Sequence, residues 1–298
     1  MKQIYLKSHN QCPVCGNALL DHYLDSVDYF FTQESFTLDR CANCGLIVTN
    51  PFPGFEESLK YYQSEAYFSH PNKKMNLFGY LYQFVRTHNM RSKIRVLKRY
   101  VRLGKVLDIG CGSGDFLVAC RDNGFDVSGI EVNEEARNYT SSRIGNRVFH
   151  PHDSLFIPSD HVDMITMWHV LEHIHDLDKQ MNDIMRMLKP NGFLLLALPN
   201  PESYDCRKYG KYWAAWDLPR HLFHFNPQTI NVLAAKFGLK QIGTYPMKWD
   251  AYYISMLSEG YRKNRLGFIK GLMAGLFSNL NARRTGNYSS LIYVFKKM

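Results

Sequence analysis

Two pairs of cysteines near the N-terminus have the spacing of a metal site. Cys12 and Cys15 stand in CPVCG, and Cys41 and Cys44 stand in CANCG, so a glycine follows each pair and lets the backbone turn back. Four thiolates form a closed tetrahedral zinc site, which leaves no open position for chemistry. The sequence therefore predicts a small zinc ribbon over residues 1–50, with a structural metal.

A second group of residues forms a glycine-rich turn directly after a short apolar strand. The stretch KVLDIGCGSGDF (105–116) places Gly110, Gly112 and Gly114 where backbone N–H groups can approach a ligand. The dinucleotide-binding motif requires a third glycine where this chain has Asp115. A carboxylate disfavours a pyrophosphate at this turn and favours S-adenosylmethionine, which carries an ammonium and a sulfonium but no phosphate.

Three further acidic residues suit the rest of that cofactor. Asp108 stands within the end of the first strand and adds a second carboxylate near the cationic groups. Glu131 ends the next strand, 23 residues further along the chain, and suits a bidentate contact with the ribose hydroxyls. Asp153 follows a third strand, where we expect it to accept a hydrogen bond from the adenine amine.

The sequence HVLEH, at the end of a fourth strand, contains candidates for a general base. It holds His169, Glu172 and His173. A histidine beside a carboxylate can remove a proton near neutral pH, so we expect His173 to be the base, with His169 as the second candidate and Glu172 orienting it. Two alternatives stay open: the three residues ligate a divalent metal, or they only line the cofactor pocket.

A third group lies in KYWAAWDLPRHLFHFNP (211–227), after the fifth strand. Trp213, Arg220, His221 and His224 fall in this one loop. Aromatic faces beside an arginine suit sugar rings and phosphates, and loops at this edge of such a sheet shape specificity. We expect these four residues to bind the acceptor; the alternative is that they pack a structural connection.

The elements that position these groups alternate between strand and helix. Apolar residues at helical spacing predict helices before residue 104, and separate strands joined by helices predict a parallel sheet covered on both faces. The expected strands are 105–109, 126–132, 147–150, 161–170, 192–199, 239–246 and 289–297, with helices at 115–123, 133–144, 176–189 and 228–238. The fold class is therefore α/β.

Four motifs occur in the order found in a known family. VLDIGCGSGDF, the strand-end Glu131, WHVLEHIHD (168–176) and LKPNGFLLLALPN (188–200) resemble the successive motifs of class I S-adenosylmethionine-dependent methyltransferases, over residues 100–245. With CPVCG, CANCG and NPFP in front, the chain is similar to a subgroup with an N-terminal zinc ribbon. That subgroup includes sugar C-methyltransferases and proteins often encoded with surface-polysaccharide genes.

The resemblance implies further structural and functional features. It implies a Rossmann-like seven-stranded sheet whose last strand is antiparallel, in a methyltransferase domain over 104–298, after a linker and helical cap over 51–103. It also implies that Tyr62 and Tyr67 lie over the active site, the alternative being ordinary helix packing. Trp168, at the start of the third motif, is assigned to the cofactor pocket.

The charge distribution bears on the partner. The formal charge is +9, with ten Lys or Arg and no acid over 66–107, and eight with no acid over 260–298. The first 55 residues hold three Lys or Arg against five acids, and a tetrathiolate zinc adds negative charge, so the ribbon is a poor phosphate binder. We therefore expect a small-molecule or glycan acceptor, such as an anionic nucleotide sugar.

An RNA methyltransferase that uses the ribbon and basic helices is the alternative function. It is disfavoured because the fourth strand lacks the N-P-P-Y type of sequence used to methylate exocyclic amines, so nucleic acid is an unlikely partner. Residues 260–298 could instead contact a membrane surface. The N-terminus lacks the apolar core of a signal peptide, and no apolar run reaches transmembrane length, so we expect a cytoplasmic protein.

Overall fold

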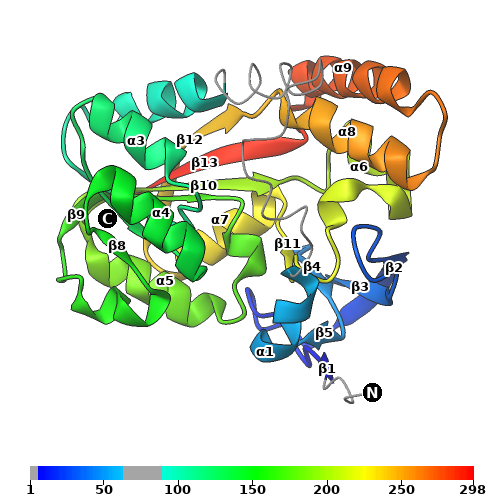
Figure 1. The fold of residues 1–298 in the computed structure, drawn as a ribbon. Helices are drawn as coiled ribbons and strands as arrows, with labels where there is room; N and C mark the ends of the chain where they lie inside the picture. The colour runs from blue at the N-terminus through cyan, green and yellow to red at the C-terminus, as the bar shows by residue number, and fades with distance from the viewer. Residues whose placement is uncertain (1–5, 63–88) are drawn as a thin grey trace.

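The chain folds around one central sheet. The structure is a computed structural model that describes residues 6–62 and 89–298. Its sheet has seven strands in the order β12-β13-β10-β9-β6-β7-β8 (Figure 1). The bounds are β6 Lys105–Ile109, β7 Asp126–Ile130, β8 Val148–Phe149, β9 Val162–Trp168, β10 Leu188–Pro199, β12 Leu239–Pro246 and β13 Ser290–Lys297. Only β13 runs against its neighbours, which confirms the predicted sheet.

Helices cover the sheet on both sides. They are α3 Asp115–Asp122, α4 Glu134–Ile144, α5 Leu177–Met187, α6 Tyr204–Tyr209, α7 Pro227–Lys236, α8 Asp250–Tyr261 and α9 Gly267–Thr285, with a further helix over 89–98. Strand side chains alternate between the two faces. In β10, Leu194 and Leu196 join one core with α5 and α7, whereas Leu195 and Ala197 join another with α3 and the 89–98 helix.

Several element bounds differ from those expected. Strand β9 ends at Trp168, before the predicted 170, because His169 has a φ of 58° and leaves the extended conformation. Strand β10 begins at Leu188 rather than at residue 192, and its pairing with β9 is irregular between Leu188 and Phe193. The helices α6 and α8 were not expected at all.

The N-terminal strands form a second, smaller sheet. It contains β2 (Leu20–Val27), β3 (Ser35–Cys41) and β4 (Ile47–Thr49), and β11 (Phe223–His224) pairs with β4 at its edge. A short pair, β1 (Leu6–Lys7) with β5 (Phe52–Pro53), and helix α1 (Phe55–Ser58) complete this region. Because β11 comes from the 211–227 loop, the ribbon lies against that loop.

Two expectations concern the organisation of the chain: its domain boundaries, and whether any helix could span a membrane. The domain boundaries at residues 50 and 103 stay predictions, and the segment 63–88 between them lies outside the described residues. Within the described part of the chain, no helix has the length and apolar content needed to cross a bilayer. The long apolar stretch 267–280 lies inside α9.

Candidate active site

The four N-terminal cysteines converge on one point. Their sulfurs all lie within 4.8 Å of one another. Cys12 Sγ lies 3.6 Å from Cys44 Sγ, and Cys15 Sγ lies 3.5 Å from Cys41 Sγ. A tetrahedral zinc with bonds of about 2.3 Å separates its sulfur ligands by about 3.8 Å. The geometry therefore fits a zinc ion and requires only a small adjustment of the side chains.

We expect the purified chain to carry one zinc, and the Cys41→Ser variant to lose it. Removing one thiolate opens the site, and a structural zinc contributes directly to folding. Elemental analysis would measure the metal, and a thermal melt would show a lower Tm. Ala42→Ser changes an exposed residue of the same knuckle without removing a sulfur, so this variant should keep the zinc and the Tm of the unchanged chain. An ordered ribbon in metal-free protein would contradict this prediction.

The glycine turn leaves open space at one position only. Gly110, Gly112 and Gly114 all have positive φ, which L side chains rarely adopt. A Cβ atom at Gly110 would meet Val170 Cγ2 at 2.5 Å, and one at Gly114 would meet Thr140 Cγ2 at 2.3 Å. Nothing lies within 4 Å of the corresponding point at Gly112. The outer two glycines are thus required by packing, and Gly112 faces a space that a ligand can enter.

The carboxylate of Glu131 holds this turn in place. Its Oε2 accepts a hydrogen bond from the Gly112 N–H at 2.8 Å, and its Oε1 accepts one from the Asn133 N–H at 2.8 Å. The side chain is 8% exposed, so the carboxylate lies at the wall of the same space. This position fits the predicted contact with ribose hydroxyls.

Asp108 lies deeper, at the end of β6. It is 2% exposed and accepts a hydrogen bond from Thr166 Oγ1 at 2.6 Å. Burial raises the pKa of Asp108 to about 7, although Thr166 and the Lys93 ammonium both oppose that rise. Its charge therefore changes close to neutral pH.

We expect S-adenosylmethionine to bind more tightly as the pH rises towards 7 and to level off above it. The cationic groups of the cofactor favour the ionised form of Asp108, so binding releases a proton wherever the free carboxyl is protonated. Affinity should change by up to about tenfold per pH unit below 7. Calorimetry in buffers of different ionisation enthalpy would measure the proton release. Asp108→Asn should flatten the profile, and an unchanged profile in that variant would contradict this assignment.

Trp168, which is predicted to line the cofactor pocket, lies beside Lys93. The indole Nε1 of Trp168 is buried without a hydrogen-bond partner among the described residues, and the ring packs edge-on against Phe116. The Lys93 Nζ lies 4.2 Å from the centre of the same ring. Burial lowers the pKa of Lys93, while Asp108 and Asp250 oppose that shift. Lys93 was not among the predicted site residues. Its spacing could have indicated it, because it stands four residues before the buried Leu97 and so lies on the same face of the 89–98 helix.

His169 is held between two carboxylates. Its Nε2 lies 3.2 Å from Asp250 Oδ2 at the start of α8, and its Nδ1 lies 3.5 Å from Glu172 Oε1. Burial disfavours the charged imidazolium, but these two partners outweigh burial and raise the pKa of His169 to about 9. At neutral pH this side chain is therefore a cation, so it cannot act as the general base.

Glu172 is a buried carboxylate surrounded by imidazoles. It lies in a short 3-10 helix, Leu171–His173, and is 1% exposed. Neither of its oxygens has a hydrogen-bond partner among the described residues. Burial raises the pKa of Glu172, but His169, His221 and His173 outweigh burial and hold it below its ordinary value. The carboxylate is thus charged and has unused acceptor capacity.

His173 has one nitrogen fixed and one available. Its Nδ1 lies 2.9 Å from the Arg220 carbonyl oxygen and 3.1 Å from the Tyr62 hydroxyl. Because a carbonyl oxygen only accepts, Nδ1 carries the proton and Nε2 is left as the basic nitrogen. Burial, together with nearby His221, lowers the pKa of His173 to about 4, so the ring is neutral at neutral pH.

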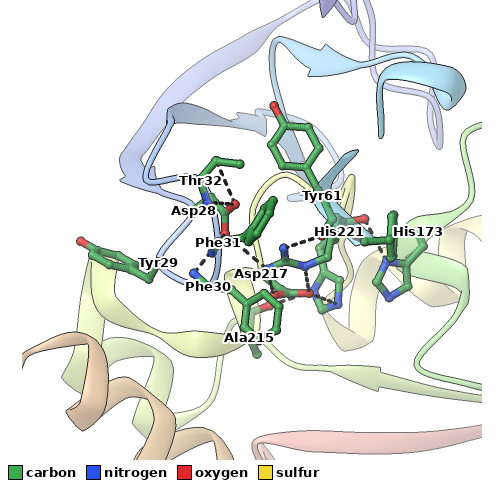
Figure 2. A network of polar contacts seen from close by, with 12 residues as sticks. Asp28, Tyr29, Phe30, Phe31, Thr32, Tyr61, His173, Ala215, Asp217 and His221 are labelled. Atoms are coloured by element: carbon green, nitrogen blue, oxygen red, sulfur yellow. Dashed lines mark hydrogen bonds and ion pairs between the residues drawn. The ribbon is translucent and has the colours of Figure 1, made fainter. Parts of the chain in front are cut away.

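Arg220 anchors this region to the ribbon (Figure 2). Its guanidinium contacts Asp217 through Nε at 3.0 Å and Nη2 at 2.5 Å, and Nη2 lies 3.4 Å from Asp28 Oδ1. Nη1 donates to the Tyr61 carbonyl at 3.2 Å, and the group stacks over the Phe30 ring. The predicted phosphate ligand is therefore 3% exposed, and its donors already have partners within the protein.

The other residues of the 211–227 loop are also inside the molecule. Trp213 is 1% exposed, and its Nε1 donates to Asp205 Oδ2 at 2.8 Å. His224 Nε2 lies 3.4 Å from Thr49 Oγ1 of the ribbon. His221 Nδ1 lies 2.9 Å from a carbonyl oxygen, and its Nε2 lies 3.9 Å from Glu172 Oε1. Of these three side chains, His221 is the one that contributes to the Glu172 cluster.

The structure changes which residues could ligate a metal near HVLEH. Among the described residues, the set that could share an ion is Glu172, His173 and His221, whose ligand atoms lie within 4.8 Å of one another. His169 is not in this set, because its ring is paired with Asp250. Asp153 lies in a 3-10 helix, Pro151–Phe156, after β8, and the expected site residue Tyr67 lies outside the described residues.

Comparisons with known proteins agree with this geometry. Residues 82–242 match the protein family described as "Methyltransferase domain". A ubiquinone biosynthesis O-methyltransferase from Nitrosospira multiformis is 26% identical over 162 residues, which cover 49% of this chain and 68% of that protein. One from Thiobacillus denitrificans is 29% identical over 149 residues, covering 46% and 64%. The chain thus spans about two thirds of the length of these relatives.

A solved structure of an S-adenosylmethionine-dependent methyltransferase from Archaeoglobus fulgidus has a TM-score of 0.48 and 17% identity, and the match covers 74% of this chain and all of that one. The family match covers more than half of the chain, and the strand order places the glycine turn, Glu131 and HVLEH at one edge of the sheet. The chain therefore belongs to the methyltransferase domain family, as a class I S-adenosylmethionine-dependent methyltransferase.

Proposed function

We propose that this enzyme methylates a small-molecule or glycan acceptor, such as a nucleotide sugar, with His173 as the general base. The observation that carries the proposal is the position of His173, whose Nδ1 is fixed, with a ring nitrogen within 4.8 Å of a carboxylate oxygen of the buried Glu172. Strand β9 leads into this pair and β6 leads into the glycine turn, and the two strands are parallel neighbours. Both groups therefore lie at the same edge of the sheet.

His173 and His169 have different roles in this proposal. When bound, S-adenosylmethionine supplies an activated methyl group and a good leaving group, so the protein has to align the acceptor and remove its proton. His173 accepts that proton at Nε2. The imidazolium that results lies near Glu172 and Asp217, which favour its positive charge, while burial and His221 oppose it. His169 is already protonated, so we assign it to holding Glu172 and the start of α8.

The acceptor site is built from the groups around His173. Tyr62 reaches the ring from the ribbon side, and we propose that its hydroxyl contacts the acceptor. Arg220 and Trp213 support this site from inside rather than touching the acceptor, because both are buried with their donors engaged. We propose zinc as the structural ion of the ribbon that carries Asp28 towards Arg220.

A phenolic hydroxyl of a quinone precursor is the second candidate acceptor. The alignment to ubiquinone biosynthesis O-methyltransferases supports it, although the identity is only 26–29% for the two relatives described above. The zinc-ribbon cysteines lie outside the matched family region, which begins at residue 82, so they give that candidate no support.

Methyl transfer to a panel of acceptors would test the proposal. The purified chain would be incubated with isotopically labelled S-adenosylmethionine and nucleotide-linked sugars, catechol-type quinone precursors, or bulk RNA. We expect labelled product with one or more of the nucleotide sugars. Product from the catechols alone would favour the second candidate. Product from RNA alone would overturn a small-molecule acceptor altogether.

A further inference from the structure

Helix α9 turns its large apolar side chains towards solvent. Seven of them are 43–59% exposed: Leu266 just before the helix, then Phe268, Ile269, Met273, Leu276, Phe277 and Leu280. Five of these positions, 266, 269, 273, 276 and 280, recur at intervals of three and four residues and so form one stripe along the helix. With Phe277 beside them, these five residues form what we call the α9 apolar stripe; at about 100° per residue, Phe268 lies on another side of the helix and is not part of it.

The opposite face of α9 is made of small residues and packs against α8. Gly271, Ala274, Gly275 and Ser278 are buried there. A Cβ atom at Gly271 would lie 2.7 Å from Met256 Cα, so the two helix backbones are in direct contact. This helix therefore buries its small residues and exposes its large ones, the reverse of the usual arrangement. Packing within the described residues does not account for the stripe.

All charged side chains of α9 and of the chain segments that flank it are basic. Residues 260–298 contain eight Lys or Arg and no acid. Lys270, Arg283 and Arg284 lie exposed on α9 itself, and Arg262, Lys263 and Arg265 lie exposed just before it. The two carboxylates of α8 do not offset this charge: Glu259 is 3% exposed, and the Asp250 side chain is 14% exposed and paired with His169.

We propose that the α9 apolar stripe and its flanking basic residues dock the enzyme on an anionic membrane surface. Phe, Leu and Ile on one side of a helix with lysine and arginine around them match a helix lying in the lipid interface. Anionic headgroups complement the positive charge of the six exposed basic residues on and just before α9. The proposal concerns an outer surface and is independent of the identity of the acceptor. Figure 1 shows α8 and α9 together at one end of the molecule.

Co-sedimentation of the full chain with vesicles would test the docking surface. We expect binding to vesicles of phosphatidylglycerol and phosphatidylcholine, weaker binding to phosphatidylcholine alone, and a decrease as salt is added. Leu276→Gln with Phe277→Gln should weaken binding by on the order of tenfold or more, since both side chains would leave the apolar layer. Arg283→Gln with Arg284→Gln should weaken it by about fivefold for each arginine on anionic vesicles.

A matched control separates this surface from general exposure of apolar residues. Leu19→Gln with Leu103→Gln changes two other exposed leucines, at 57% and 69% exposure, and should leave vesicle binding unchanged. Light scattering of each variant would report self-association. The proposal is overturned by absent vesicle binding, by an equal loss in the control, or by a solution dimer that Leu276→Gln with Phe277→Gln dissociates.

Discussion

Replacing His173 with asparagine should lower kcat by roughly 10²–10⁴-fold while leaving the affinity for S-adenosylmethionine nearly unchanged. Asparagine keeps a polar side chain of similar reach next to the Arg220 carbonyl but has no basic nitrogen. The His173 ring has the Arg220 carbonyl oxygen and the Tyr62 hydroxyl as hydrogen-bond partners, and neither belongs to the glycine turn or to Glu131, where we expect the cofactor to bind. Single-turnover kinetics and calorimetry on the same variant would separate the two quantities.

A second histidine of the same strand region provides the control. His161 stands just before β9, at the opposite edge of the sheet, where its Nε2 lies 3.2 Å from Lys105 Nζ. His161→Asn should therefore leave turnover close to that of the unchanged enzyme. If His173→Asn lost cofactor affinity and turnover together, the residue would be structural. If it lost neither, His173 would have no part in proton removal.

The parts of the site that could be predicted are those formed by neighbours in the chain. Gly110, Gly112 and Gly114 form one turn, and Glu172 and His173 follow one strand, so spacing alone places them together. Arg220 was recognised as a candidate, but its role was not, because its partner Asp28 lies 192 residues earlier. Lys93 was missed for the same reason: only the folded structure brings it over Trp168.

The missed elements have a related physical cause. The buried face of α8 contains Ser255, Ser258 and Glu259, so it lacks the apolar periodicity by which helices are recognised. In helix α9 the apolar residues do recur at helical spacing, but the large ones face solvent. The spacing therefore indicates a helix and assigns the wrong face of it to the core. Strand β11 has two residues, too few for any pattern, although it joins the ribbon to the loop that carries Arg220.

The ribbon supports the active site through Asp28. This residue is fully buried, and its carboxylate accepts hydrogen bonds from the backbone N–H groups of Phe30, Phe31 and Thr32 as well as facing Arg220 (Figure 2). Arg220 in turn presents its carbonyl oxygen to His173. Removing one partner of a charge pair that is this buried lowers the stability of the fold strongly, because the remaining charge has no solvent to stabilise it.

Arg220→Met should therefore lower the free energy of unfolding by about 3–5 kcal/mol, because Asp28 and Asp217 lose their common cation in a buried setting. Urea unfolding followed by tryptophan fluorescence would measure it. Arg121→Met is the matched control: the Arg121 and Asp122 side chains are 45% and 59% exposed, so the change should be below about 1 kcal/mol. The double variant Asp28→Asn with Arg220→Met should cost less than the sum of the two single changes, since each removes the charge that the other leaves unpaired. Additive costs would mean that the two residues do not interact, and the ribbon would then stabilise His173 by another route.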